Sequence, residues 1–216
     1  MQLFKSKKWS SALLLSLVIT SAALAQKDSV NKFEGVALTP SAQIEDGTSK
    51  IELKNVSHGV RKKKAFGLVT VRVYVAEFFA QNPPKLVKTD EGILASLKEA
   101  GPVQLRLTML RDLKGSDIYK AFTESLNANH IDTTKMSAPL QSVMDEIKAV
   151  EKFKENEVFT ITSLWKDSKS HLVITKPDGS TKSISGDEDF AKQFLSIWFG
   201  EPVDDKLADL KKALLK

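Results

Sequence analysis

The sequence predicts an α+β domain in which helices cover one face of an antiparallel sheet. Runs of apolar residues typical of strands occupy residues 51–79 and 103–109 and return over 158–184. Apolar residues at helical spacing occupy 116–150 and 187–214. The order is therefore strands, helices, strands, helices, without the regular alternation of a parallel α/β sheet, and this order favours the α+β class.

The first strands follow a polar segment. Residues 26–49 carry only a weak strand pattern near residues 36–38, before Pro40. A strand is predicted over Ile51–Val56, and Gly59 is expected to break the pattern.

A single long strand is then predicted from His58 to Phe79, ended by Asn82-Pro83-Pro84. Small apolar residues share one face of it: Ala65, Gly67, Val69, Val71, Val73 and Val75. The other face mixes sizes and polarities, as in Phe66, Leu68, Thr70, Arg72, Tyr74 and Phe78. Because successive side chains point to opposite faces, one face is expected to pack on helices. The other is expected to line a cavity with Arg61 near its mouth, which suits an apolar ligand with an anionic head.

The middle of the chain continues with a short helix over 92–99 and a half-buried strand over 103–109. Ser116 is expected to cap a helix whose apolar stripe holds Ile118, Tyr119, Phe122 and Leu126. A second helical stripe runs from Leu140 to Val150.

The last third predicts strands over 158–165, 172–175 and 181–184, with a turn at Pro177-Asp178-Gly179. Asp187 is expected to cap a helix that ends at Gly200, just before Pro202. Leu207, Leu210 and Leu214 predict a final amphipathic helix.

The first 25 residues predict an export signal. Lys5, Lys7 and Lys8 form a basic start, an apolar run follows, and Ala23-Leu24-Ala25 is a typical cleavage site. The alternative is an uncleaved N-terminal anchor, but the run is short for a spanning helix. We expect a periplasmic or secreted protein in which residues 26–216 form a single domain.

Charge and cysteine content narrow the function classes. The net charge is +5, but without the three lysines of residues 1–25 it becomes 29 basic against 27 acidic residues, or +2. The composition therefore gives no support for nucleic-acid binding. Cysteine is absent, which excludes disulfides and thiolate chemistry.

No motif for a metal or cofactor is apparent. His58, His130 and His171 are far apart, and no phosphate-binding loop or nucleophile elbow occurs. Lys62-Lys63-Lys64 is a short basic run that reads as a solvated segment. We expect no cofactor, no metal and no catalytic residue.

Three segments carry a family resemblance. They are Gly59-Val60-Arg61 with the strand ending in Val71–Ala76, Met109–Leu113 before a helix, and Asp189–Val203 with the leucines that follow. Together, over roughly residues 33–215, they resemble the chalcone isomerase-like superfamily, in particular its bacterial exported members. The resemblance implies an open-faced β-sandwich with a cleft between sheet and helices for a planar or acyl ligand. Some members close chalcones into flavanones, and others bind fatty acids without catalysis.

The resemblance also implies site residues. The family arginine matches Arg61, whereas its threonine, tyrosine and asparagine fall at Val69, Ile118 and Ser125. Thr70 and Tyr119 are the adjacent residues of the right type. The predicted ligand contacts are therefore Arg61, Thr70 and Tyr119, although Arg61 alone also fits a surface residue or a structural ion-pair partner.

Most of the family's catalytic polar set is missing, which favours a non-catalytic binder. The expected ligand is a small amphipathic molecule such as a fatty acid or a phenolic or other aromatic acid. Two alternatives stay open: an isomerase of the chalcone isomerase type, and a protein-interaction module that uses the cleft surface.

Overall fold

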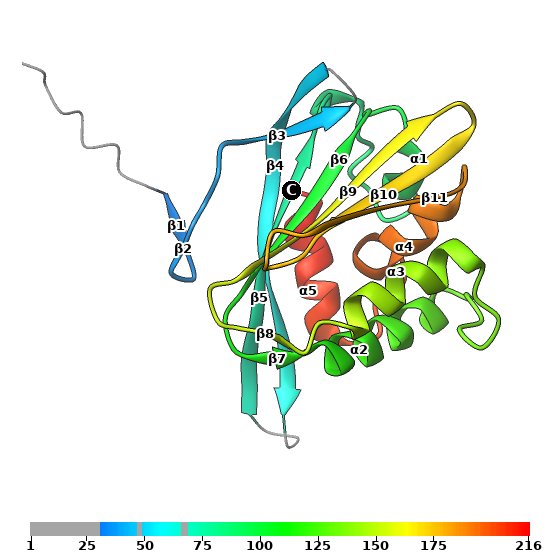
Figure 1. Ribbon diagram of the computed structural model, residues 1–216. Coiled ribbons are helices and arrows are strands. Elements are labelled where there is room, and N and C mark those ends of the chain that lie inside the picture. Colours follow the sequence, from blue (N-terminus) through cyan, green and yellow to red (C-terminus); the bar gives the residue numbers. More distant parts are fainter. Residues whose placement is uncertain (1–30, 47–48, 66–68) are drawn as a thin grey trace, which may run out of the picture.

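Seven antiparallel strands form the central sheet of the computed structural model (Figure 1), which describes residues 31–46, 49–65 and 69–216. Their spatial order is β11-β10-β9-β6-β5-β4-β3. The strands are β3 (Ser41–Asp46), β4 (Ser49–Ala65), β5 (Val69–Ala80), β6 (Val103–Met109), β9 (Val158–Lys166), β10 (Lys169–Thr175) and β11 (Thr181–Asp187). Two short pairs lie outside this sheet: β1 (Lys32–Phe33) with β2 (Val36–Ala37), and β7 (Leu113–Lys114) with β8 (Lys152–Phe153).

The helices cover one face of the sheet (Figure 1). They are α1 (Ile93–Ser96), α2 (Gly115–Ala128), α3 (Ala138–Lys148), α4 (Phe190–Phe199) and α5 (Asp205–Leu214), with a 3₁₀ turn over Pro83–Lys85. Helix α4 contributes the most buried aromatic side chains, among them Phe190, Phe194 and Trp198. This layering is the predicted α+β fold, and the sheet with helices on one face is confirmed.

The predicted long strand over 58–79 is wrong. Two strands replace it: β4 runs through Gly59 without a break and ends at Ala65, and β5 returns antiparallel from Val69. The apolar pattern continues where the chain changes direction between β4 and β5, which is why the sequence predicts one strand. Phe66, Gly67 and Leu68 lie outside the described residues.

The hairpin of β4 and β5 contains a bulge that changes which side chains share a face. Arg61 pairs with Tyr74, but Lys62 pairs with Arg72, so Val73 is an extra residue on β5. Contrary to the prediction, Val71 and Val75 therefore lie on different faces of the hairpin. Tyr74, Ala76 and Phe78 belong to the helix-side core, whereas Val75 pairs with Val60 on the other face.

Gly59 brings α5 onto β4. A Cβ at this position would lie 2.8 Å from both the Ala213 Cβ and the Leu210 Cδ1, so the helix contacts the strand backbone closely. The Ser57 hydroxyl also donates to the Leu214 carbonyl at 2.6 Å. Gly59 was expected to break the strand, but its function here is close packing.

The described residues before β3, numbers 31–40, lie on the side of the sheet away from the helices (Figure 1). The Thr39 backbone N–H donates to Glu77 Oε1 at 2.7 Å, and Arg106 Nη1 donates to the Thr39 hydroxyl at 2.6 Å. Glu77 is fully buried, and its Oε2 and Arg106 Nε have no hydrogen-bond partner among the described residues. Burial raises the pKa of Glu77, while the Thr39 N–H and Arg106 oppose that shift.

The other elements follow the predicted order, with small differences. Strand β6 has the predicted bounds, but six of its seven residues are buried, since it is a central strand between β5 and β9 and its apolar residues face the core. Strand β3 was not predicted, and α2 and α4 begin after Lys114 and Asp189 rather than after Ser116 and Asp187. Among the described residues, no helix is long and apolar enough to cross a membrane.

Candidate functional site

A cavity of about 370 Å³ opens beside the free end of the β4–β5 hairpin. It lies between this hairpin, α2 and the segment that joins α4 to α5. Its lining residues are Arg61, Lys63, Lys64, Val71, Val73, Tyr74, Arg111, Leu113, Asp117, Ile118, Ala121, Phe122, Glu124, Ser125, Ile197, Val203 and Leu207. The volume is within the range of small-molecule sites.

Most of the wall is apolar. The bulge places both Val73 and Tyr74 on the cavity although they are adjacent in sequence. Opposite them, Ile118 and Phe122 lie one helical turn apart on α2. Phe122 packs edge-on against Trp198, with ring centroids 5.0 Å apart, so the wall continues directly into the core.

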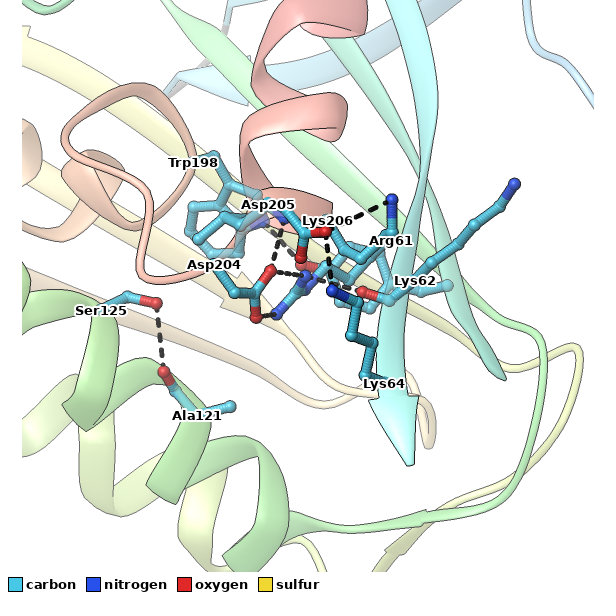
Figure 2. A network of polar contacts seen from close by, with 11 residues as sticks. Arg61, Lys62, Lys64, Ala121, Ser125, Trp198, Asp204, Asp205 and Lys206 are labelled. Atoms are coloured by element: carbon cyan, nitrogen blue, oxygen red, sulfur yellow. Dashed lines mark hydrogen bonds and ion pairs between the residues drawn. The ribbon is translucent and has the colours of Figure 1, made fainter. Parts of the chain in front are cut away.

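Arg61 forms a bidentate ion pair with Asp204 at one end of the cavity (Figure 2). Arg61 Nη1 and Nη2 donate to Asp204 Oδ1 and Oδ2, each at 2.7 Å, and Nη1 also donates to the Lys62 carbonyl. Arg61 is only 8% exposed. Such a two-point pair is both strong and directional.

Asp204 is held in place from the other side as well. It is the N-cap of α5, and its Oδ1 accepts a hydrogen bond from the Leu207 N–H at 2.7 Å. Burial alone would raise the pKa of Asp204, but the hydrogen bonds from Arg61 and Leu207 lower it below its ordinary value. The carboxylate therefore stays ionised beside Arg61 at neutral pH.

Tyr74 lies close to the same arginine. Its hydroxyl accepts a hydrogen bond from the Trp198 indole N–H at 3.0 Å. Burial raises the pKa of Tyr74 to about 12, although Arg61 and Trp198 oppose the shift. The hydroxyl is therefore a neutral group at the cavity wall, and its own proton has no acceptor within the described part of the chain.

The hairpin rim of the cavity is basic, whereas the α2 rim carries charges of both signs. The hairpin rim has Lys63 and Lys64, and Lys64 pairs with Asp205 at 3.0 Å (Figure 2). The α2 rim has Asp117 and Glu124, with Arg111 before the helix. Lys63 and Arg111 have no ion-pair partner among the residues described.

Of the three predicted ligand contacts, Arg61 lines this cavity, and Thr70 and Tyr119 are not among its lining residues. Thr70 is exposed and alternates with Val71, so it points to the other face of the hairpin. Tyr119 is one step around α2 from Ile118, or about 100°. The Nζ of Lys148 lies over the Tyr119 ring, 5.1 Å from its centroid. A ligand role for Thr70 or Tyr119 therefore remains a prediction.

The positions implied by the family resemblance divide in the same way. Ile118 and Ser125 line the cavity, whereas Val69 is 59% exposed and is not a lining residue. The Ser125 hydroxyl donates to the Ala121 carbonyl at 3.1 Å (Figure 2), which leaves its lone pairs toward other donors.

Sequence reasoning missed Asp204 and the Tyr74–Trp198 pair. Asp204 had a local signal, since an acid directly before an amphipathic helix is typical of an N-cap. Its pairing with Arg61, 143 positions away, had none. Among the described residues, no group of three His, Cys, Asp or Glu is placed to hold a metal ion.

The comparison with known families explains this architecture. The chalcone isomerase-like family matches residues 30–216. The chain belongs to the chalcone isomerase-like family. A crystal structure of an Arabidopsis thaliana fatty-acid binding protein is similar, with a TM-score of 0.55 and 17% identity over 81% of this chain and 96% of that chain. At this identity the likeness establishes the fold alone, and no curated protein sequence matches this chain.

Proposed function

We propose that this chalcone isomerase-like protein binds a small amphipathic anion, a fatty acid or an aromatic acid, in the cavity beside the hairpin and releases it unchanged. The observation that carries the proposal is the cavity itself, whose walls are mostly apolar and whose hairpin rim is cationic. The similar fold of a fatty-acid binding protein supports it.

The apolar tail would lie against the hairpin valines and the apolar face of α2, with Val71, Val73 and Phe122 as the main contacts. Burying a methylene group contributes about 0.8 kcal/mol, which is roughly a four-fold gain in affinity. The head group would lie toward Lys63 and Lys64 on the hairpin rim, away from Asp117 and Glu124 on the α2 rim, with Arg61 deeper in the site. Thr70 and Tyr119 become contacts only for a ligand that extends beyond the cavity.

A binding role fits these side chains better than catalysis. Ile118 has no acid or base function where the family resemblance implies a tyrosine, and Ser125 donates to a backbone carbonyl. The isomerase alternative has one observation in its favour, the Tyr74 hydroxyl beside Arg61 at the cavity wall.

The test is a titration with saturated fatty acids of increasing length, with the matching alcohols as uncharged controls. Affinity should rise by about four-fold for each methylene until the chain outgrows the cavity, and each acid should bind more tightly than its alcohol. Native mass spectrometry of protein from its own source should find a co-purified acid. If no acid in the series shows saturable binding, the proposal is wrong.

A matched pair of variants locates the head group. Lys63 lines the cavity, whereas Lys62 is on the other face of the same strand, with its Nζ 4.0 Å from Glu34. Lys63→Gln should weaken acid binding by about two- to five-fold, the usual range for an exposed charge. Lys62→Gln should leave the affinity unchanged. Equal effects of the two would place the head group elsewhere.

We also propose export with cleavage after Ala25, which rests on the sequence of residues 1–25 alone. N-terminal sequencing of protein from the periplasm or the medium should begin at Gln26. Recovery of the form that starts at Met1 would contradict it.

A further inference from the structure

Arg61 is the buried arginine of the cavity, and an acid of the protein already pairs with it. Arginine has five N–H donors. Three of them are used by Asp204 Oδ1, Asp204 Oδ2 and the Lys62 carbonyl. A ligand carboxylate that arrives from the cavity therefore meets a guanidinium whose charge is already balanced.

Asp204 is also placed independently of Arg61. The Leu207 N–H holds its carboxylate at the N-terminus of α5, where a negative charge is stabilised by the helix dipole. This second hydrogen bond therefore stabilises the position of the acid beside Arg61. Asp204 is not itself a lining residue of the cavity, but Figure 2 shows it on the side of Arg61 that faces Ser125 of α2, which is one.

We propose that Asp204 is the specificity-determining residue of the cavity: it competes with the ligand's head group for Arg61 and so limits the affinity for anions. This inference rests on the proposed function and adds to it the residue that sets head-group preference. A ligand carboxylate reaches the Nη1/Nη2 fork of Arg61 only by displacing Asp204, and at the two remaining donors it meets a guanidinium whose charge Asp204 already balances. With Asp204 in place, the exposed cations of the rim carry most of the selectivity.

The decisive variant is Asp204→Asn. Asparagine caps helices as well as aspartate does, so its Oδ1 can still accept from the Leu207 N–H. It has no charge and only one acceptor oxygen, so Arg61 is released for the ligand. Dodecanoate should bind about ten-fold or more tightly than it binds the wild type, as expected for one charge-assisted hydrogen bond, while dodecanol should bind equally well to both.

Two controls separate competition from a general change in charge. Asp205→Asn removes the neighbouring acid, which pairs with Lys64 and makes no hydrogen bond to Arg61. It should change dodecanoate affinity by less than about three-fold. The double variant Asp204→Asn with Arg61→Ala should lose the gain. If Asp204→Asn does not fold, Asp204→Ser keeps a capping oxygen and replaces it in every comparison.

The outcomes are distinguishable. A gain that depends on Arg61 and is specific to the acid supports the inference. Wild-type binding of dodecanoate with no gain in Asp204→Asn overturns the inference and leaves the proposed function standing, as does a gain that persists without Arg61 or an equal gain in Asp205→Asn. No dodecanoate binding by any of the proteins overturns both.

Discussion

Individual polar side chains at this cavity are held by other residues, and those partners decide what the groups can do. Arg61 has Asp204, and Tyr74 has Trp198. Each interaction crosses from the sheet to the segment after residue 190, so it joins the hairpin to the helical layer. These buried polar groups are therefore part of the packing as well as of the cavity wall.

Tyr74→Phe tests this at the level of one hydroxyl. Trp198 is buried, and its indole N–H would lose its acceptor, which costs about 1–3 kcal/mol. The thermal midpoint should fall by about 2–4 °C for each kcal/mol in a chain of this size. Tyr119→Phe is the control, because no hydrogen bond of its hydroxyl is present among the described residues. A similar midpoint for the two variants would argue against a structural role for the Tyr74 hydroxyl.

The buried carboxyl group of Glu77 predicts that the stability of the fold depends on pH. Its pKa is raised from the ordinary 4.5 by burial, so the folded protein binds this proton more tightly than the unfolded chain. Stability from this group is therefore fully present below pH 4.5 and declines as pH rises through the raised pKa.

Glu77→Gln removes that titration. The midpoint of the variant minus that of the wild type should grow as pH increases from about 4.5, with Arg106 and His58 as the neighbouring charges common to both proteins. Differential scanning calorimetry across this range measures it. If the midpoint difference stays constant or shrinks with increasing pH, ionisation of Glu77 does not destabilise the folded protein.

At the level of elements, the hairpin of β4 and β5 positions the cavity, and α5 holds the hairpin in place. Helix α5 packs along β4 at Gly59, caps its own N-terminus with Asp204 and accepts a hydrogen bond from Ser57 near its C-terminus. The cavity-lining residue Leu207 belongs to the same helix. A displacement of α5 should therefore alter both stability and the ligand site.

Gly59→Ala produces such a displacement with one methyl group. The new Cβ would lie 2.8 Å from Leu210 Cδ1 and Ala213 Cβ, so the helix must shift or the side chains must move. Overpacking of this kind costs about 1–3 kcal/mol. Lys54→Ala, at an exposed position of the same strand, should be nearly neutral. Urea unfolding of the two variants measures the difference. Equal midpoints would mean that α5 moves away from β4 without a loss of stability.

The sequence allowed most elements of the fold to be predicted, because residues such as Leu105 and Leu107, or Phe190 and Phe194, repeat with the periods of strand and helix. The hairpin was missed because the apolar run from Ala65 through Gly67 to Val69 continues directly into the alternating valines of β5 without a strong turn motif. Arg61 lines the cavity, and its role as a ligand contact stays a prediction. Its partner could not be predicted, since nothing local to Asp204 specifies a contact 143 positions away.

At the level of the whole molecule, the chalcone isomerase-like fold has a cavity between sheet and helices, and polar side chains of its wall form hydrogen bonds or ion pairs within the protein. Arg61 is neutralised by Asp204, the Tyr74 hydroxyl has a pKa of about 12, and Ser125 donates to its own helix. Acid–base catalysis requires positioned groups whose pKa values are near the working pH. None of these three groups meets that condition at neutral pH.

We therefore expect no ring closure of a chalcone above the spontaneous rate. Each missing donor typically costs about two orders of magnitude in rate, and Ile118 supplies none where the family resemblance implies a tyrosine. The measurement follows the loss of chalcone absorbance at neutral pH, with an active chalcone isomerase as the positive control. Because the Tyr74 hydroxyl is the one observation that favours the isomerase alternative, Tyr74→Phe is measured in parallel. Turnover by the wild type that disappears in Tyr74→Phe would favour the isomerase alternative and assign the Tyr74 hydroxyl to its mechanism.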